Sequence, residues 1–168
     1  MSDRHHVLLI GFTDAAACRL AYEDAKHLPG LRQAAVLERS ADGIIDVPES
    51  HTRGAGVPTV GGGMVGGLVG LLAGPIGALL GFAAGAAIGN AAEQNWERDG
   101  GAGLILLSAQ VQDGTAMLVV DITESDPGPA DQLAADHGGH LERRAAEDFA
   151  EEVRKAREAA EQTPPEGE

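Results

Sequence analysis

Cysteine, aromatic residues and positive charge are all scarce in this chain of 168 residues. The single cysteine, Cys18, excludes an intramolecular disulfide and fits a reducing compartment. Aromatic residues make up 3% of the sequence, so a core must be built mostly from Leu, Val, Ile and Ala. Only 12 Lys and Arg stand against 26 Asp and Glu, which gives a formal net charge of −14. Such a chain repels phosphate, so nucleic acid is excluded as a partner, and any membrane contact has to be hydrophobic.

The N-terminus also lacks the features of a secretory signal peptide. The residues MSDRHH are followed by a short apolar run, and no small-residue cleavage site follows that run. We therefore expect a protein of the cytoplasmic membrane whose folded domain faces the cytoplasm, or alternatively a cytoplasmic protein.

Glycine, in contrast, is abundant and unevenly placed. The chain has 24 glycines, about twice the usual share of about 7%, and thirteen of them lie between Gly54 and Gly89. Residues 54–92, here called the glycine segment, contain no Asp, Glu, Lys or Arg, and Gly74-Pro75 stands at their centre. This composition predicts two apolar helices joined by a turn.

Within the glycine segment, eight glycines recur every four residues in two runs. They are Gly62, Gly66, Gly70 and Gly74 before Pro75, and Gly77, Gly81, Gly85 and Gly89 after it. Residues four apart share one face of a helix, so each run would present a groove without side chains. Such grooves allow helices to pack closely, as in the small-xxx-small interfaces of membrane helices. The pattern predicts a glycine-zipper hairpin whose eight glycines mediate helix packing and oligomerisation.

Energetics favour a packed hairpin over a flexible linker. A glycine inside a helix costs about 1 kcal/mol relative to alanine, so eight cost roughly 8 kcal/mol, which close packing must offset. Flexible linkers are polar and their glycines have no regular spacing, whereas this segment is apolar and its glycines are regularly spaced. Each half, 57–73 and 76–92, would be roughly 26 Å long as a helix, against about 30 Å for a bilayer core. Insertion into a membrane and burial in a soluble oligomer therefore both stay open.

The flanking regions predict alternating strands and helices. Before the glycine segment we expect a strand at Val7–Phe12, a helix from Thr13-Asp14 to Pro29-Gly30 and a strand at Gln33–Arg39. A turn at Asp42-Gly43 should then lead to a paired strand at Ile44–Val47, followed by a polar connector at Pro48–Arg53. After the glycine segment we expect a strand or short buried helix at Leu104–Val111, a turn at Asp113-Gly114 and a strand at Thr115–Ile122. A helix at Pro129–Asp136 and an edge strand at His140–Arg144 should follow. The chain should end in a charged helix at Ala145–Glu161 and a disordered tail.

This order indicates an α+β fold of the ferredoxin-like β-α-β / β-α-β type, interrupted by the glycine-zipper helical hairpin. We divide the chain into four parts: residues 1–53 form the first half of the α+β domain, 54–92 the hairpin, 93–144 the second half, and 145–168 a charged helix with an acidic tail.

No set of residues predicts a catalytic, cofactor or metal site. His137 and His140 are separated by two glycines and lack the third and fourth ligands of a zinc site, so a solvated turn is favoured. The glycines at 61, 63 and 66 fit GxGxxG, but no acid follows until Glu93, so a dinucleotide site is rejected. Cys18 is expected to be a small buried residue of an amphipathic helix. The histidines at 5 and 6 are expected to form the polar start of a strand. The acids of residues 121–161 are expected to be exposed to solvent and to keep the protein soluble.

Several of these stretches, taken in order, resemble the DUF1269 family of bacterial predicted membrane proteins. They are AVLERSADGIIDVPESHT, GGGMVGGLVGLLAGPIGALLGFAAGAAIG, VQDGTAMLVVDI and HGGHLERR, which together cover roughly residues 5–160. The resemblance implies a small stress- or envelope-associated protein without an assigned activity, and it favours a helix at 104–111. The acidic C-terminal extension departs from the family pattern.

The function expected from the sequence is non-enzymatic self-association through the glycine segment at the cytoplasmic membrane. The partners would be a second copy of the chain and the lipid bilayer. Two alternatives are a soluble homo-oligomeric scaffold with its hairpins buried in the assembly, and a small-ligand binding module on the face of the sheet. A polar pocket on that face would identify the second alternative.

Overall fold

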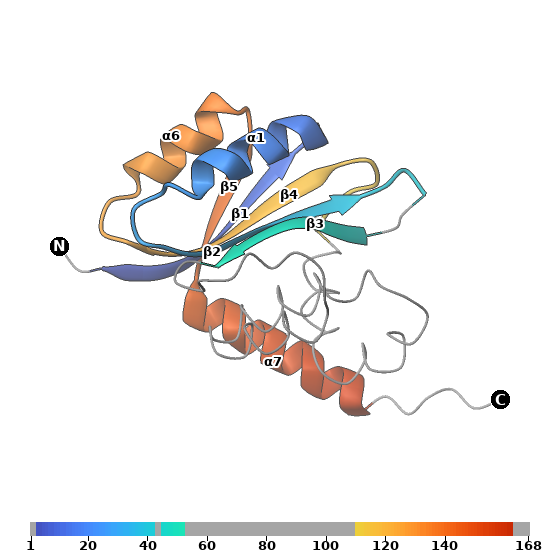
Figure 1. The fold of residues 1–168 in the computed structure, drawn as a ribbon. Helices are drawn as coiled ribbons and strands as arrows, with labels where there is room; N and C mark the ends of the chain where they lie inside the picture. Colours follow the sequence, from blue (N-terminus) through green and yellow to red (C-terminus); the bar gives the residue numbers. More distant parts are fainter. Residues whose placement is uncertain (1–2, 43–44, 53–109, 163–168) are drawn as a thin grey trace.

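The computed structural model describes residues 3–42, 45–52 and 110–162, which form a mixed α+β fold (Figure 1). The elements are β1 (Arg4–Phe12), α1 (Ala15–Ala25), β2 (Leu31–Arg39), β3 (Ile45–Thr52), β4 (Ala116–Glu124), α6 (Gly128–Asp136), β5 (His140–Ala145) and α7 (Ala146–Gln162). The glycine segment, Leu104–Ala109 and the tail from residue 163 lie outside the described residues. The predicted α+β class is confirmed.

All five strands belong to one antiparallel sheet with the order β3-β2-β4-β1-β5. β4 lies between β1 and β2, so a strand from the second half of the chain is inserted between two strands of the first half. β5 pairs with β1 alone, and its place at the edge of the sheet confirms the prediction for this strand. β3 forms the opposite edge.

Local sequence signals explain where α1 begins and ends. The Asp14 side chain accepts a hydrogen bond from the Ala16 amide at 3.0 Å, which caps the helix at its predicted start. α1 ends at Ala25, shortly before Pro29-Gly30. Its buried side is formed by Cys18, Ala21, Tyr22 and Ala25.

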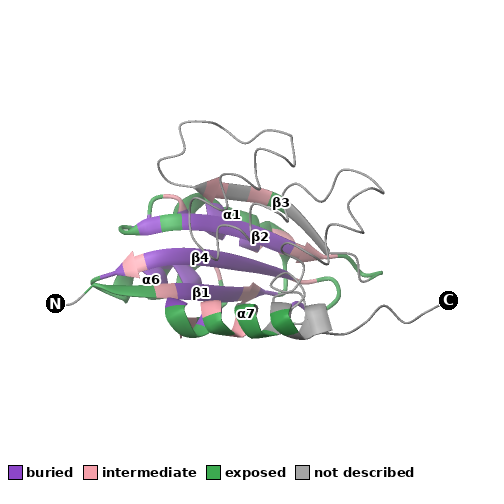
Figure 2. Ribbon diagram, turned by 90° about the horizontal axis from the view of Figure 1, so that it is seen from below, coloured by how far each residue is buried: buried purple, intermediate pink, exposed green. Residues whose placement is uncertain are grey.

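The sheet has two buried faces, because successive residues of a strand point to opposite sides. α1 and α6 cover one face, where the main core contains Leu8, Ile10, Phe12, Ala34, Val36, Leu118, Val120 and Ile122. α7 lies on the opposite face, with Phe149 fully buried (Figures 1 and 2). The buried residues outside the main core include Val7, Leu9, Ala35, Leu37, Met117 and Val119. We call the side that carries α7 the second face.

Several predicted boundaries were wrong, most clearly those of β3 and β1. The connector expected at Pro48–Arg53 is largely strand, since β3 continues to Thr52 and pairs with β2 as far as Gln33. Polar side chains hid this strand, because pairing at a sheet edge needs backbone groups rather than apolar side chains. β1 likewise starts at Arg4 rather than Val7, and so includes the polar residues before the apolar run.

Other predictions were confirmed. The helix expected at Pro129–Asp136 is α6, and the turn at Asp113-Gly114 leads into β4. In α7, Lys155 and Glu151 form an i,i+4 ion pair, with 2.9 Å between Nζ and Oε1. Gln110 and Val111, the last residues of the segment left open between strand and helix, lie in a turn and a bend.

Gly30 joins α1 to β2 at a close backbone contact, which yields a stability test. Its φ is 77°, and a Cβ built there would lie 2.0 Å from the carbonyl oxygen of Thr123. We predict that Gly30→Ala lowers the free energy of unfolding by about 3 kcal/mol or more, because a left-handed conformation costs an L residue roughly 1–2 kcal/mol and the clash adds to it.

Gly114→Ala is the matched control, since Gly114 has a φ of 75° but no atom within 4 Å of the place that a Cβ would occupy. It should lose only the conformational part, about 1 kcal/mol. Urea denaturation followed by circular dichroism measures both. Equal losses in the two variants would contradict the role assigned to the Thr123 contact.

Candidate functional site

The eight glycines predicted to mediate packing lie outside the described residues, but the structure places the two points between which their segment is attached. Before the segment, Thr52 of β3 pairs with Gln33 of β2. After it, the Gly114 amide donates to the Arg39 carbonyl at 2.8 Å, and the Arg39 amide donates to the Thr115 carbonyl at 3.0 Å. These contacts lie at opposite ends of β2, six residues or roughly 20 Å apart. The described chain therefore stops at one end of β2 and resumes beside the other end.

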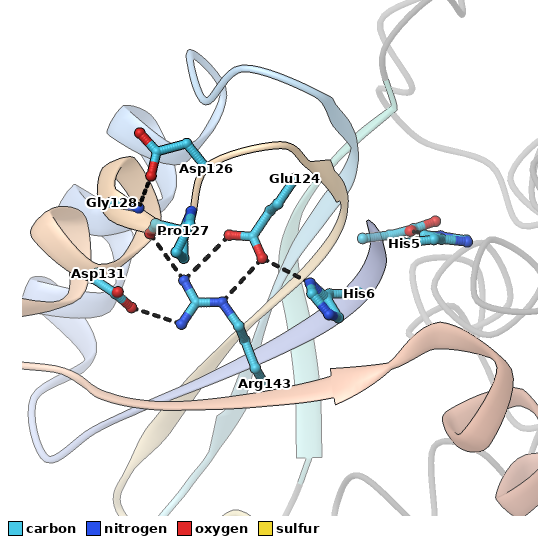
Figure 3. A network of polar contacts seen from close by, with 9 residues as sticks. His5, His6, Glu124, Asp126, Pro127, Gly128, Asp131 and Arg143 are labelled. Atoms are coloured by element: carbon cyan, nitrogen blue, oxygen red, sulfur yellow. Dashed lines mark hydrogen bonds and ion pairs between the residues drawn. The ribbon is translucent and has the colours of Figure 1, made fainter. Parts of the chain in front are cut away.

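A polar cluster occupies the end of the sheet where β1 begins and β4 ends (Figure 3). Its centre is Glu124, whose side chain is only 4% exposed. The carboxylate accepts hydrogen bonds from Arg143 Nε at 3.0 Å and Nη2 at 3.2 Å, and it lies 2.9 Å from His6 Nδ1. A buried carboxylate is costly unless it is paired and hydrogen-bonded, and Glu124 has both kinds of partner.

Arg143 connects this cluster to the start of α6. Its Nη1 donates to Asp131 at 2.7 Å, and its Nη2 donates to the carbonyl of Pro127 at 3.0 Å (Figure 3). The hydrogen bonds to Glu124 and Asp131 raise the pKa of the Arg143 guanidinium above its ordinary value, against the opposing effect of burial. A single guanidinium thus connects β4, β5 and the first turn of α6.

A second buried carboxylate, Asp121, is paired on the second face. Its side chain is 2% exposed and lies 2.5 Å from His5 Nε2 and 3.9 Å from Arg32 Nε. Arg32 Nη1 also approaches His5 Nε2 at 3.3 Å. Because Nε2 is the atom that faces Asp121, the proton belongs between His5 and Asp121, and the Arg32 contact is a secondary one. His5 and His6, adjacent in β1, therefore serve opposite faces of the sheet.

These contacts hold the start of β1 against the end of β4. A histidine–carboxylate pair can also orient a general base, but a catalytic triad needs a nucleophile within hydrogen-bond reach of the imidazole. Among the described residues, the side chains that hydrogen-bond to the His5 and His6 imidazoles are carboxylates, and the Arg32 guanidinium lies beside His5. The arrangement fits a structural role in fastening the sheet.

The histidines at 137 and 140 do not share a site. His137 Nε2 lies 2.7 Å from a carboxylate oxygen of Asp24 and so connects the end of α6 to α1. His140 is exposed at the start of β5. Within residues 3–42, 45–52 and 110–162, no group of three or more His, Cys, Asp or Glu could hold a metal ion.

Cys18 is a core residue. Its side chain is fully buried in α1 among the residues that pack on β1 and β2. Burial, with a smaller contribution from Glu38, raises the pKa of the thiol to about 12. The thiol therefore stays protonated at neutral pH, and the prediction of a small buried residue is confirmed.

Sequence reasoning missed both polar pairs. The acids of residues 121–161 were expected to be solvating, which is wrong for Asp121 and Glu124. The sequence did contain a signal: both acids lie in the same strand as AMLVV and Ile122, where an acid needs a partner. Their histidine partners could not be found this way, because they are 116 and 118 residues away along the chain.

Comparisons with known proteins assign no family to the chain. No family model, curated protein or solved structure matched it. Among α1, α6 and α7, the helices of the part that the structure describes, none is long and apolar enough to span a membrane.

The Glu124 cluster predicts a large effect of losing its cation. Arg143→Met should lower the free energy of unfolding by about 2–3 kcal/mol, because it leaves a buried carboxylate with His6 as its remaining hydrogen-bond partner. Arg154→Met is the matched control, since Arg154 is 59% exposed and its partners Glu151 and Glu158 are also exposed. Chemical denaturation at pH 7 measures both, and a loss no larger in Arg143→Met than in the control would contradict the assigned role.

The burial of Cys18 predicts that its thiol is unreactive in the folded protein. At pH 8 the folded protein should react with a maleimide far more slowly than the protein unfolded in urea, because both access and the thiolate fraction are low. The labelled fraction, measured by mass spectrometry, should rise along the urea unfolding curve. Rapid modification of the folded protein would show that α1 does not cover the thiol.

Proposed function

We propose that this protein is a non-enzymatic, self-associating protein that acts at the cytoplasmic membrane through its glycine segment. The observation that carries the proposal is the phase of the eight glycines, in two runs of four, within an uncharged stretch of 39 residues. Eight glycines in helices cost roughly 8 kcal/mol of helix propensity. Close packing of helices along the faces that carry these glycines would offset this cost. The structural role of the polar clusters supports the non-enzymatic part of the proposal.

We further propose that the α+β part is a ferredoxin-like head on the cytoplasmic side. The order β5-β1-β4-β2, with α1 and α6 on one face, supports this, and β3 is then an added strand at the β2 edge. Both ends of the glycine segment connect to this one head, so the segment has to leave and return on the same side of a bilayer. The described residues on either side of the insertion, Thr52 and Gly114, lie at opposite ends of β2.

The length of the segment is also compatible with a soluble alternative. Each half would be roughly 26 Å long, shorter than a bilayer core of about 30 Å, which also fits a soluble homo-oligomer whose hairpins are buried in the assembly. A ligand module on the second face has less support. Leu9, Ala35 and Val119 on that face are at most 2% exposed, so a ligand would have to displace whatever covers them.

Substitution within the stripe tests the packing. Gly70→Leu and Gly81→Leu should reduce the oligomer size of the detergent-solubilised or soluble protein, because the added side chain prevents close approach of the helices. Ala83→Leu adds similar bulk two residues beyond Gly81, on the other side of the predicted helix, and should leave the size unchanged. Light scattering after size-exclusion chromatography measures this, and an unchanged oligomer in both glycine variants would rule out packing through the stripe.

Fractionation separates the membrane proposal from the soluble alternative. Protein that stays in the pellet through high salt and alkaline carbonate, and is released by detergent alone, is inserted in the bilayer. A single defined oligomer in the soluble fraction would instead establish the buried-hairpin scaffold.

A further inference from the structure

We draw no further inference here: the strongest candidate, the side-chain cluster of His5, Asp121 and Arg32 at the end of the sheet where β1 begins, belongs to the polar site already described, where its three groups are held by one another.

Discussion

The insertion of β4 between β1 and β2 is the contact on which the rest of the structure depends. Nine residues of β4 pair with β1 on one side, and most also pair with β2 on the other. All but Thr123 are buried, so this strand supplies apolar side chains to both cores. The α1–α6 layer, the packing of α7 and the attachment points of the insertion all follow from its position. Closing the sheet brings together residues far apart in sequence, and the entropic cost of such a loop rises only slowly with its length, so a long insertion is tolerated.

The sequence predicted the elements whose signals are local. The apolar run ending at Phe12, the helix start at Thr13-Asp14 and the turn at Asp113-Gly114 each depend on a few residues, and each was found in the structure. β3 was underestimated, because a strand at an edge can be polar on both faces and still pair through its backbone. The polar clusters were missed for a different reason. Their partners meet only after β4 has been placed beside β1, and no spacing in the sequence encodes that contact.

The two clusters also show how a chain of net charge −14 uses its few cations. Among the described residues, Arg143 and Arg32 lie beside the two buried acids, Glu124 and Asp121, whereas several other acids are exposed. A buried carboxylate without a cation would weaken the end of the sheet far more than a surface pair could strengthen it. The contribution of each arginine to the stability of this protein therefore depends on its position. The candidate glycine site rests on a different physical basis, the absence of side chains, and it remains a prediction from sequence periodicity.

Pro48 in β3 affects how copies of this protein can assemble. It lies in the outermost strand, between the Glu49–Val36 and Asp46–Glu38 pairs, and proline has no amide hydrogen to donate. A strand from another molecule that added to this edge would lack a hydrogen bond near the middle of its ladder. The other edge strand, β5, carries Glu142, Arg143 and Arg144, charged residues of the kind that discourage edge-to-edge pairing. Neither margin of the sheet therefore favours growth into a continuous intermolecular sheet, and fibre-like stacking of heads is disfavoured even when many copies are held close together.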